Sequence, residues 1–581
     1  MTKHDARSAW GYFSIGALRH LGFLVLAMPL ATCAAERPRA PVAGPGAPTQ
    51  MAELVPSEET ATGRYLAGRH AETVREISKA ADYIAATLKD DPDNFDLLNR
   101  AYNLMLADGR MGEAGALARR IVDFQPASPL AGLVLAIEDA KTGKLAEVER
   151  RLGLIPRTGA NRLFVPLLSA WAMQGQGRTA AALQALVPLA DNSGFAQLHD
   201  LHAAYINDLA GINDGAEVSY RAVFNQPNPP LRAFEAYGSF LSRANREAEA
   251  KTLYERYERQ NPESDFLAPS RERPISTALE GMAEALFNVA GLLRQDAGGQ
   301  TSLYFTRLAI HLRPEFPAAQ VTIGEILDAQ GRDEDAVLAY KAVRPDSPFG
   351  WIARIRLAET LNTLDRTDEA TKLLLGMAEE RPARSDAMLA LAGLYRTKDR
   401  YADSAQAYDR AIARIPRLEQ RHWGILYGRG IALERSKQWP RAEADFVRAL
   451  ELQPEQPDVM NYLAYSWVDQ GLNIERALRM LERAVELRPN NGYIIDSLGW
   501  ALYRMGRFPD AVVYLERAVE LQPADATLLD HLGDAMWRVG RQAEARYQWE
   551  RALQSKPDPA HIPEIQAKLA RGLTAPSTRG G

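Results

Sequence analysis

Prolines recur in the last third of the chain at an almost constant interval. Pro454, Pro489, Pro523 and Pro557 are separated by 35, 34 and 34 residues, and each follows an apolar pattern of helical period. About 34 residues accommodate two helices and their turns, and such a pair cannot bury its apolar face alone, so copies must stack on one another. The chain of 581 residues is therefore a poor fit to independent domains of roughly 150 residues each.

Small residues mark the places where the two helices of a unit should touch. In the unit that ends at Pro523, Gly499 and Ala511 occupy positions where a larger side chain would force two antiparallel helices apart. Leu502 and Leu515 fill the space between the helices, and the proline ends the second helix because it cannot continue one. The next unit repeats the order with Leu532, Gly533, Met536, Ala545, Trp549 and Ala552.

This order of residues resembles the tetratricopeptide repeat family. The resemblance covers most of residues 62–557, strongly after about residue 317 and weakly between 127 and 230. It implies an all-α fold, a right-handed α-solenoid of stacked antiparallel helix pairs. Residues 263–316 depart most from the pattern and are the place where the solenoid would divide into two halves.

The pattern divides the chain into seven segments. A helix that closes the last exposed face is predicted from Ile562, Ile565 and Leu569, which lie at helical spacing. The predicted segments are a signal peptide with a possible lipidation site (1–33), a Pro/Ala-rich linker (34–61), degenerate N-terminal repeats (62–262), a divergent connecting region (263–316), a C-terminal repeat array (317–557), a capping helix (558–573) and a disordered tail (574–581).

The start of the chain has the layout of a secretory signal. A loosely basic segment precedes LGFLVLAMPLATCAA, residues 21–35, which is too short to span a bilayer. Residues 30–33, LATC, resemble a bacterial lipobox, in which Cys33 would carry the lipid, although Thr32 departs from that pattern. One alternative is cleavage after Ala34 or Ala35, which discards Cys33 and leaves a soluble periplasmic protein; if there is no signal, the protein is a cytoplasmic scaffold.

Composition and motifs argue against several kinds of function. The formal charge of −5 provides no basic field for nucleic acid, and a single cysteine excludes an internal disulfide framework and multi-cysteine metal sites. No phosphate loop, HExxH, GxSxG or CxxC motif occurs. His199 and His202 lie three residues apart but lack a third ligand. We therefore predict no enzyme, no cofactor and no metal, while two carboxylates acting across a groove remain the catalytic alternative.

The repeat register predicts a protein-binding surface. In the tetratricopeptide family, positions 2, 5, 9, 12 and 13 of a unit face a concave groove, where aromatic rings and arginines can anchor a partner. The alternative is that these rings pack on neighbouring helices. Asn461, Arg504 and Arg538 only loosely resemble the basic clamp by which some members hold a terminal carboxylate. The candidate residues are Tyr427, Arg435, Asn461, Tyr465, Tyr493, Asp496, Trp500, Tyr503, Arg504, Asp530, Asp534, Trp537 and Arg538.

Three sequence runs suggest a class of function. NYLAYSWVDQG, IIDSLGWALYRMGR and LLDHLGDAMWRVGR resemble envelope tetratricopeptide lipoproteins of Gram-negative bacteria, some of which deliver cell-wall hydrolases to a carboxy-terminal processing protease. The resemblance implies a membrane-anchored scaffold or adaptor on the periplasmic side of the envelope that binds other proteins or peptide segments. A scaffold for envelope polymer export or outer-membrane assembly is the alternative, and the sequence leaves the oligomeric state open.

Overall fold

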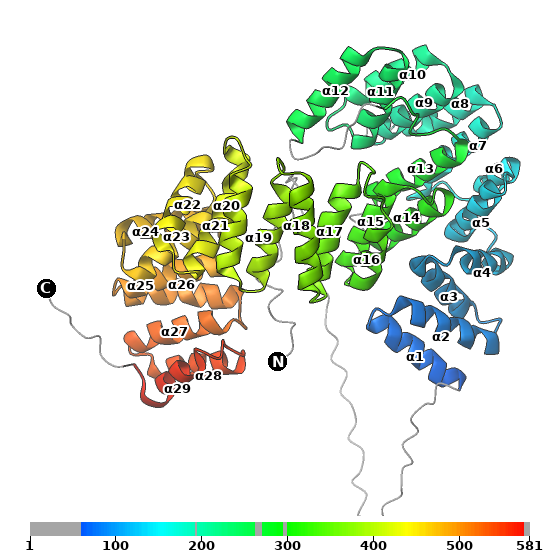
Figure 1. The fold of residues 1–581 in the computed structure, drawn as a ribbon. Helices are drawn as coiled ribbons and strands as arrows, with labels where there is room; N and C mark the ends of the chain where they lie inside the picture. Colours follow the sequence, from blue (N-terminus) through cyan, green and yellow to red (C-terminus); the bar gives the residue numbers. More distant parts are fainter. Residues whose placement is uncertain (1–59, 192–193, 262–269, 294–298, 574–581) are drawn as a thin grey trace, which may run out of the picture. The chain divides into compact units, whose positions relative to one another are not determined.

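The computed structural model describes residues 60–191, 194–261, 270–293 and 299–573 (Figure 1). The predicted signal peptide with Cys33, the predicted linker up to residue 59 and the predicted tail at 574–581 lie outside these residues. Within the described part the chain consists of helices and connecting turns, without strands. The prediction of an all-α solenoid of helix pairs is confirmed.

Consecutive helices pair across short turns and then stack on the next pair. The first six pairs are α1 (Ala61–Thr73), α2 (Ile77–Asp90), α3 (Phe95–Asp108), α4 (Met111–Phe124), α5 (Pro129–Lys141), α6 (Leu145–Leu154), α7 (Asn161–Gly175), α8 (Thr179–Ala190), α9 (Ala196–Ala210), α10 (Asn213–Phe224), α11 (Leu231–Arg243) and α12 (Glu247–Gln260). The pair that follows is α13 (Ala278–Leu292) and α14 (Gln300–Leu312).

The remaining pairs run from α15 to α28, and one further helix, α29, ends the described chain. They are α15 (Pro317–Ala329), α16 (Asp333–Lys341), α17 (Gly350–Thr363), α18 (Thr367–Glu380), α19 (Asp386–Thr397), α20 (Tyr401–Ile412), α21 (Trp423–Arg435), α22 (Trp439–Leu452), α23 (Pro457–Gln470), α24 (Ile474–Leu487), α25 (Gly492–Arg504), α26 (Phe508–Leu521), α27 (Ala526–Arg538), α28 (Gln542–Gln554) and α29 (Ile562–Arg571). A short 3₁₀ turn, Gln420–His422, precedes α21.

Glycines hold the helices of a pair close together. A Cβ atom at Gly499 of α25 would lie 2.7 Å from Leu515 Cγ of α26, and one at Gly533 of α27 would lie 2.5 Å from Trp549 Nε1 of α28. Glycine also makes the turn between the two helices, since Gly506 has a φ of 76°, a left-handed conformation that side chains disfavour. The seam predicted from the small residues is therefore present between α25 and α26 and between α27 and α28.

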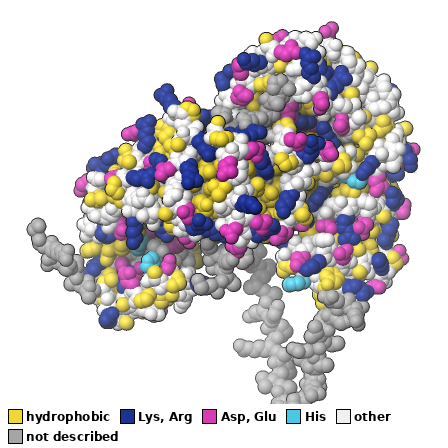
Figure 2. Space-filling model, in the orientation of Figure 1, with side chains coloured by type: hydrophobic (Ala, Val, Ile, Leu, Met, Phe, Trp, Pro, Cys, Tyr) yellow, Lys and Arg dark blue, Asp and Glu magenta, His cyan; other side chains and the backbone are white. Residues whose placement is uncertain are grey.

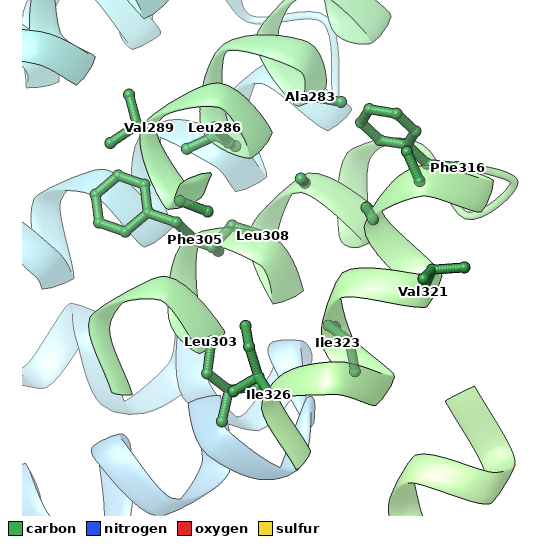
Figure 3. Close-up of a cluster of buried hydrophobic side chains, with 14 of the residues drawn as sticks. Ala283, Leu286, Val289, Leu303, Phe305, Leu308, Phe316, Val321, Ile323 and Ile326 are labelled. Atoms are coloured by element: carbon green, nitrogen blue, oxygen red, sulfur yellow. The ribbon is translucent and has the colours of Figure 1, made fainter. Parts of the chain in front are cut away.

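The apolar core is continuous through the divergent stretch. One cluster of buried side chains runs from Ala71 to Ala411 and a second from Ala405 to Ile565. Side chains of α13, α14 and α15 belong to the first cluster and lie together in Figure 3. The apolar core is therefore not divided within residues 263–316, where a division was predicted. The boundary between the two clusters lies near α20 instead.

Two further features bear on function. Helix α29 packs on α28 and buries Ile565 in the second cluster, at the position of the predicted capping helix.

On the face drawn in Figure 2, cationic and anionic side chains are interspersed. Mixed surface charge of this kind favours no single class of charged partner.

Candidate functional site

The candidate residues lie on the first helices of the last four pairs. Within this layer α23 contacts α25, and α25 contacts α27. We call the candidate side chains on these helices the C-terminal wall: Tyr427 and Arg435 on α21, Asn461 and Tyr465 on α23, Tyr493, Asp496, Trp500, Tyr503 and Arg504 on α25, and Asp530, Asp534, Trp537 and Arg538 on α27.

The wall residues differ in exposure. Tyr493 is 38% exposed, and Tyr465, Trp500, Tyr503 and Trp537 are partly buried, so the structure does not seal these rings inside the core. The rings therefore combine apolar area with access from solvent, as the anchor residues of protein interfaces do.

Three candidates instead belong to the interior. Tyr427 is 8% exposed and its ring packs 6.1 Å from Phe446 and 6.0 Å from Tyr462. Asp496 and Asp534 are also buried. For Tyr427 the alternative prediction, packing on neighbouring helices, describes the structure better.

A ladder of parallel rings joins α25 to α27. The Trp500 ring lies 4.0 Å from the His531 ring and 4.8 Å from the Tyr503 ring, with interplanar angles of 14° and 11°. Asp496 places both carboxylate oxygens 3.0 Å from His531 Nδ1. Burial opposes a charge on the imidazole, but the Asp496 carboxylate outweighs it and raises the pKa of His531. The ladder fixes the orientation of Trp500.

A buried cation closes the end of the wall. Lys568 of α29 places Nζ 2.9 Å from Asp530 Oδ2 and 3.0 Å from Asp534 Oδ2, while Trp549 Nε1 donates to Asp534 Oδ1 at 3.0 Å. Burial, reinforced by the neighbouring Asp530, raises the pKa of Asp534 to about 6. The two carboxylates outweigh the burial of Lys568 and raise the pKa of its ammonium group. The capping helix is thus held by charge as well as by apolar contact.

Neither His531 nor Lys568 was predicted as part of the site. His531 lies 35 residues after Asp496, and Lys568 lies 34 residues after Asp534. Both pairs therefore join equivalent or adjacent positions of successive units. A search for opposite charges at the repeat spacing would have found them.

The arginines of the wall lie in the last turns of the first helices. Arg504 Nη1 lies 3.5 Å from Asp469 Oδ1, Arg538 Nε donates to Tyr503 Oη at 3.4 Å, and the Arg435 guanidinium stands 5.1 Å from the Tyr401 ring centroid. Arg504 and Arg435 are exposed. Forked donors at the rim of an aromatic surface suit carboxylate or carbonyl groups of a partner.

Two acceptors near the wall are buried without a hydrogen bond. Within the described residues, neither Asn461 Oδ1 nor Asp530 Oδ1 has a hydrogen-bond partner. A buried acceptor without a donor costs about 1–3 kcal/mol. Asn461, Arg504 and Arg538 lie on three successive first helices.

The described residues form neither a metal cluster nor a membrane-spanning helix. No group of three or more His, Cys, Asp or Glu side chains is placed to hold a metal ion there. His202 is buried and its Nδ1 accepts a hydrogen bond from Trp171, whereas His199 faces Asp200, so the two histidines serve different contacts. Among the described helices, none has the length and apolar character required to cross a bilayer.

Comparison with known proteins locates the repeats independently. The family model described as tetratricopeptide repeat matches residues 65–129, 427–492 and 497–561. The TPR repeat-containing protein PA4667 of Pseudomonas aeruginosa is 25% identical over 198 residues, which are 34% of this chain and 33% of that protein. The chain thus matches about a third of the length of that relative.

Two solved structures also match this chain. A tetratricopeptide repeat protein from Parabacteroides merdae is 16% identical with a TM-score of 0.37, and the match covers 44% of this chain and 98% of that one. The Cut9–Hcn1 hetero-tetramer of the APC/C contains a chain that is 13% identical with a TM-score of 0.37, and the match covers 89% of this chain and 97% of that one.

Proposed function

We propose that this chain, a tetratricopeptide-repeat protein, is a non-catalytic scaffold that binds other proteins or peptide segments through the C-terminal wall. The observation that carries the proposal is the combination of partly exposed rings and exposed arginines on one layer of helices. Aromatic and arginine side chains supply most of the binding energy at protein interfaces.

The wall is held in shape before a partner arrives. The Asp496–His531 contact joins α25 to α27, and Lys568 joins α27 to α29. Side chains fixed in this way lose little conformational freedom on binding, which leaves more of the contact energy for affinity. Binding should therefore depend on the exposed anchors Tyr493 and Arg504, with the buried pairs acting as their support.

Site-specific photo-crosslinking tests the proposal. A photoreactive amino acid at position 493 of the full chain should capture partner proteins, and Arg504→Glu should reduce the yield at least tenfold because it reverses a charge at the rim of the wall. Tyr547 of α28 is the matched control, since it is an exposed tyrosine outside the wall. Equal capture from positions 493 and 547, unchanged by Arg504→Glu, would refute the proposal.

A narrower role follows from the resemblance to envelope lipoproteins. We propose that the scaffold acts as an adaptor that brings a carboxy-terminal processing protease and a cell-wall hydrolase together. Two proteins bound to one chain meet at an effective concentration far above their free concentrations. Affinity purification from envelope extracts should recover both partners with the wild-type protein, and fewer of them with Arg504→Glu. Recovery of export machinery instead would favour the alternative scaffold role.

The proposed location rests on Cys33. We propose that this cysteine carries a lipid that anchors the protein on the periplasmic side of the envelope. Labelling with radioactive palmitate should mark the wild-type protein and leave Cys33→Ala unlabelled, with the variant shifting from the membrane to the soluble periplasmic fraction. Equal labelling or equal fractionation of the two proteins would exclude the anchor.

A further inference from the structure

Helices α13 and α14 cover first helices of the N-terminal pairs. Helix α13 packs against α7 and α9, and α14 packs against α3 and α5. The surface of α7, α9 and α11 that faces α13, which we call the N-terminal layer, is therefore covered by the chain itself. Figure 3 shows apolar side chains of α13, α14 and α15 that lie together in the first core cluster.

Small residues bring α13 close to α7. A Cβ atom at Gly281 of α13 would overlap the buried ring of Trp171, and one at Gly175 of α7 would lie 2.8 Å from Ala278 Cβ. Any larger residue at position 281 would displace the helix from Trp171. The N-terminal layer thus fits a helix with a narrow, small-residue face.

A buried ion pair joins α13 to α11. Glu284 of α13 is fully buried, and Arg232 of α11 donates from Nη2 to Oε2 at 2.7 Å and from Nε to Oε1 at 3.0 Å. Arg232 also pairs with Glu235 on its own helix. A bidentate contact between a guanidinium and a carboxylate fixes both the position and the rotation of the carboxylate. Removing one partner of a buried pair leaves the other charge without compensation.

A second buried polar contact joins α13 to α9. His202 Nδ1 lies 3.0 Å from Trp171 Nε1, and His202 Nε2 lies 3.3 Å from the Asn288 side-chain amide. An indole N–H only donates, so Nδ1 accepts and the neutral ring carries its proton on Nε2, beside the Asn288 side-chain amide. Burial lowers the pKa of His202 to about 4, which keeps the ring neutral in this arrangement.

We propose that the N-terminal layer is a helix-binding surface, that α13 is its resident ligand, and that a separate helix of the same chemistry binds there when α13 is released. The required chemistry is a small residue, a carboxylate and an amide in the spacing of Gly281, Glu284 and Asn288. These positions are i, i+3 and i+7, which lie on one face of a helix. This surface is separate from the C-terminal wall and does not rest on the function proposed for it.

The covalent connection between α13 and the rest of the chain explains why α13 occupies the N-terminal layer in the intact protein. A short connection within one chain gives a ligand an effective concentration of about 1 mM or more. A free helix of equal affinity therefore competes poorly with the resident one. Reversing the charge of Glu284 removes that advantage, because it sets a cation against Arg232 in a buried site.

A peptide with the sequence of residues 278–292 tests the proposal on the full chain. Fluorescence anisotropy should show micromolar binding of the labelled peptide to the Glu284→Arg protein, and binding at least tenfold weaker to wild type. Glu258→Arg, which makes the same charge change at an exposed site on α12, should behave as wild type. A peptide that itself carries Glu284→Arg should bind none of the three proteins. Equal peptide binding by wild type and Glu284→Arg would overturn the proposal.

A milder variant covers the case in which Glu284→Arg does not fold. Glu284→Gln keeps the shape of the side chain and removes its charge. Hydrogen exchange should then be at least tenfold faster in α13 than in wild type and unchanged in α25 and α27. Adding the peptide should restore slow exchange in α7 and α9. An equal acceleration along the whole chain, or no protection by the peptide, would show that α13 is an integral core helix and refute the proposal.

Discussion

The cation at the end of the C-terminal wall gives a sharp test of the site's electrostatics. Lys568→Met keeps an apolar stem on α29 and removes the ammonium group between Asp530 and Asp534. Loss of one partner from a buried ion pair costs about 3–5 kcal/mol, because the remaining charge stays buried. Here two carboxylates remain, so we expect a loss in this range for the unfolding of α27, α28 and α29.

The loss of stability in Lys568→Met should be larger at high pH than at low pH. Asp534 has a pKa of about 6 beside Lys568, compared with about 3.9 in an unfolded chain. Ionising a carboxyl whose folded pKa is raised destabilises the fold, and this difference corresponds to about 3 kcal/mol above pH 6. Without Lys568 the pKa of Asp534 rises further. The variant should therefore be least stable above pH 6 and should recover as the pH falls and Asp534 is protonated in the folded state.

The raised pKa of Lys568 does not obscure this result. A folded pKa above the unfolded value stabilises fully below about pH 10.4, the unfolded value for lysine. Lys568 is therefore protonated in both the folded and the unfolded state between pH 5 and 8, and its own titration adds no pH dependence there. Any difference between the two proteins that changes in that interval reports on the carboxylates.

Urea unfolding and hydrogen exchange of α27, α28 and α29 at pH 5 and pH 7.5 measure the effect. The double variant Lys568→Met/Asp534→Asn is the control, since its amide still accepts from Trp549 and carries no charge. It should lose less stability than Lys568→Met at pH 7.5 and show little pH dependence. A loss of the same size at both pH values, or no loss at pH 7.5, would refute the assignment of charge in this cluster.

Two further predictions concern the packing seam and the ring ladder. Gly533→Ala should destabilise by about 1–3 kcal/mol in urea, because its Cβ would meet Trp549; Gly393→Ala, which faces open space in α19, should be neutral or stabilising by up to about 1 kcal/mol. Asp496→Asn should lower the pKa of His531 in an NMR titration. The stabilisation by this pair is present in wild type below the unfolded histidine pKa of about 6.5 and is lost as the pH rises through the folded value; an unchanged His531 pKa would contradict the reasoning.

The repeat fold could be predicted from the sequence because its causes are local. Gly499 and Gly533 are needed where one helix meets the next, and Pro489 and Pro523 lie two residues after the ends of α24 and α26. The contacts involved lie within a unit or between adjacent units. Such contacts recur every 34 residues, so the residues that make them form a visible pattern in the sequence. The pairing of the helices could therefore be predicted from that pattern.

The placement of α13 and α14 could not be predicted in this way. Arg232 and Glu284 are 52 residues apart, and Arg332, which donates to the Ala107 carbonyl, is 225 residues from it. Neither separation is a multiple of the repeat, so periodicity carries no information about them. Tyr427 was misplaced for a related reason: the register gives a position in a unit, whereas its burial depends on the size of Phe446 and Tyr462 beside it.

The first helices of this chain serve two different purposes, and side-chain size separates them. The N-terminal layer meets α13 where Gly175 lies against Ala278 and Trp171 against Gly281, so a helix can approach closely and fill it. In α25 and α27 the corresponding layer carries Tyr493, Trp500, Tyr503 and Trp537, which are too large for such an approach. Tyr493, Trp500 and Tyr503 keep some exposure to solvent, whereas Trp537 lies against Gly572 at the end of α29. The same stacking of helix pairs thus produces a filled layer at one end and an open wall at the other.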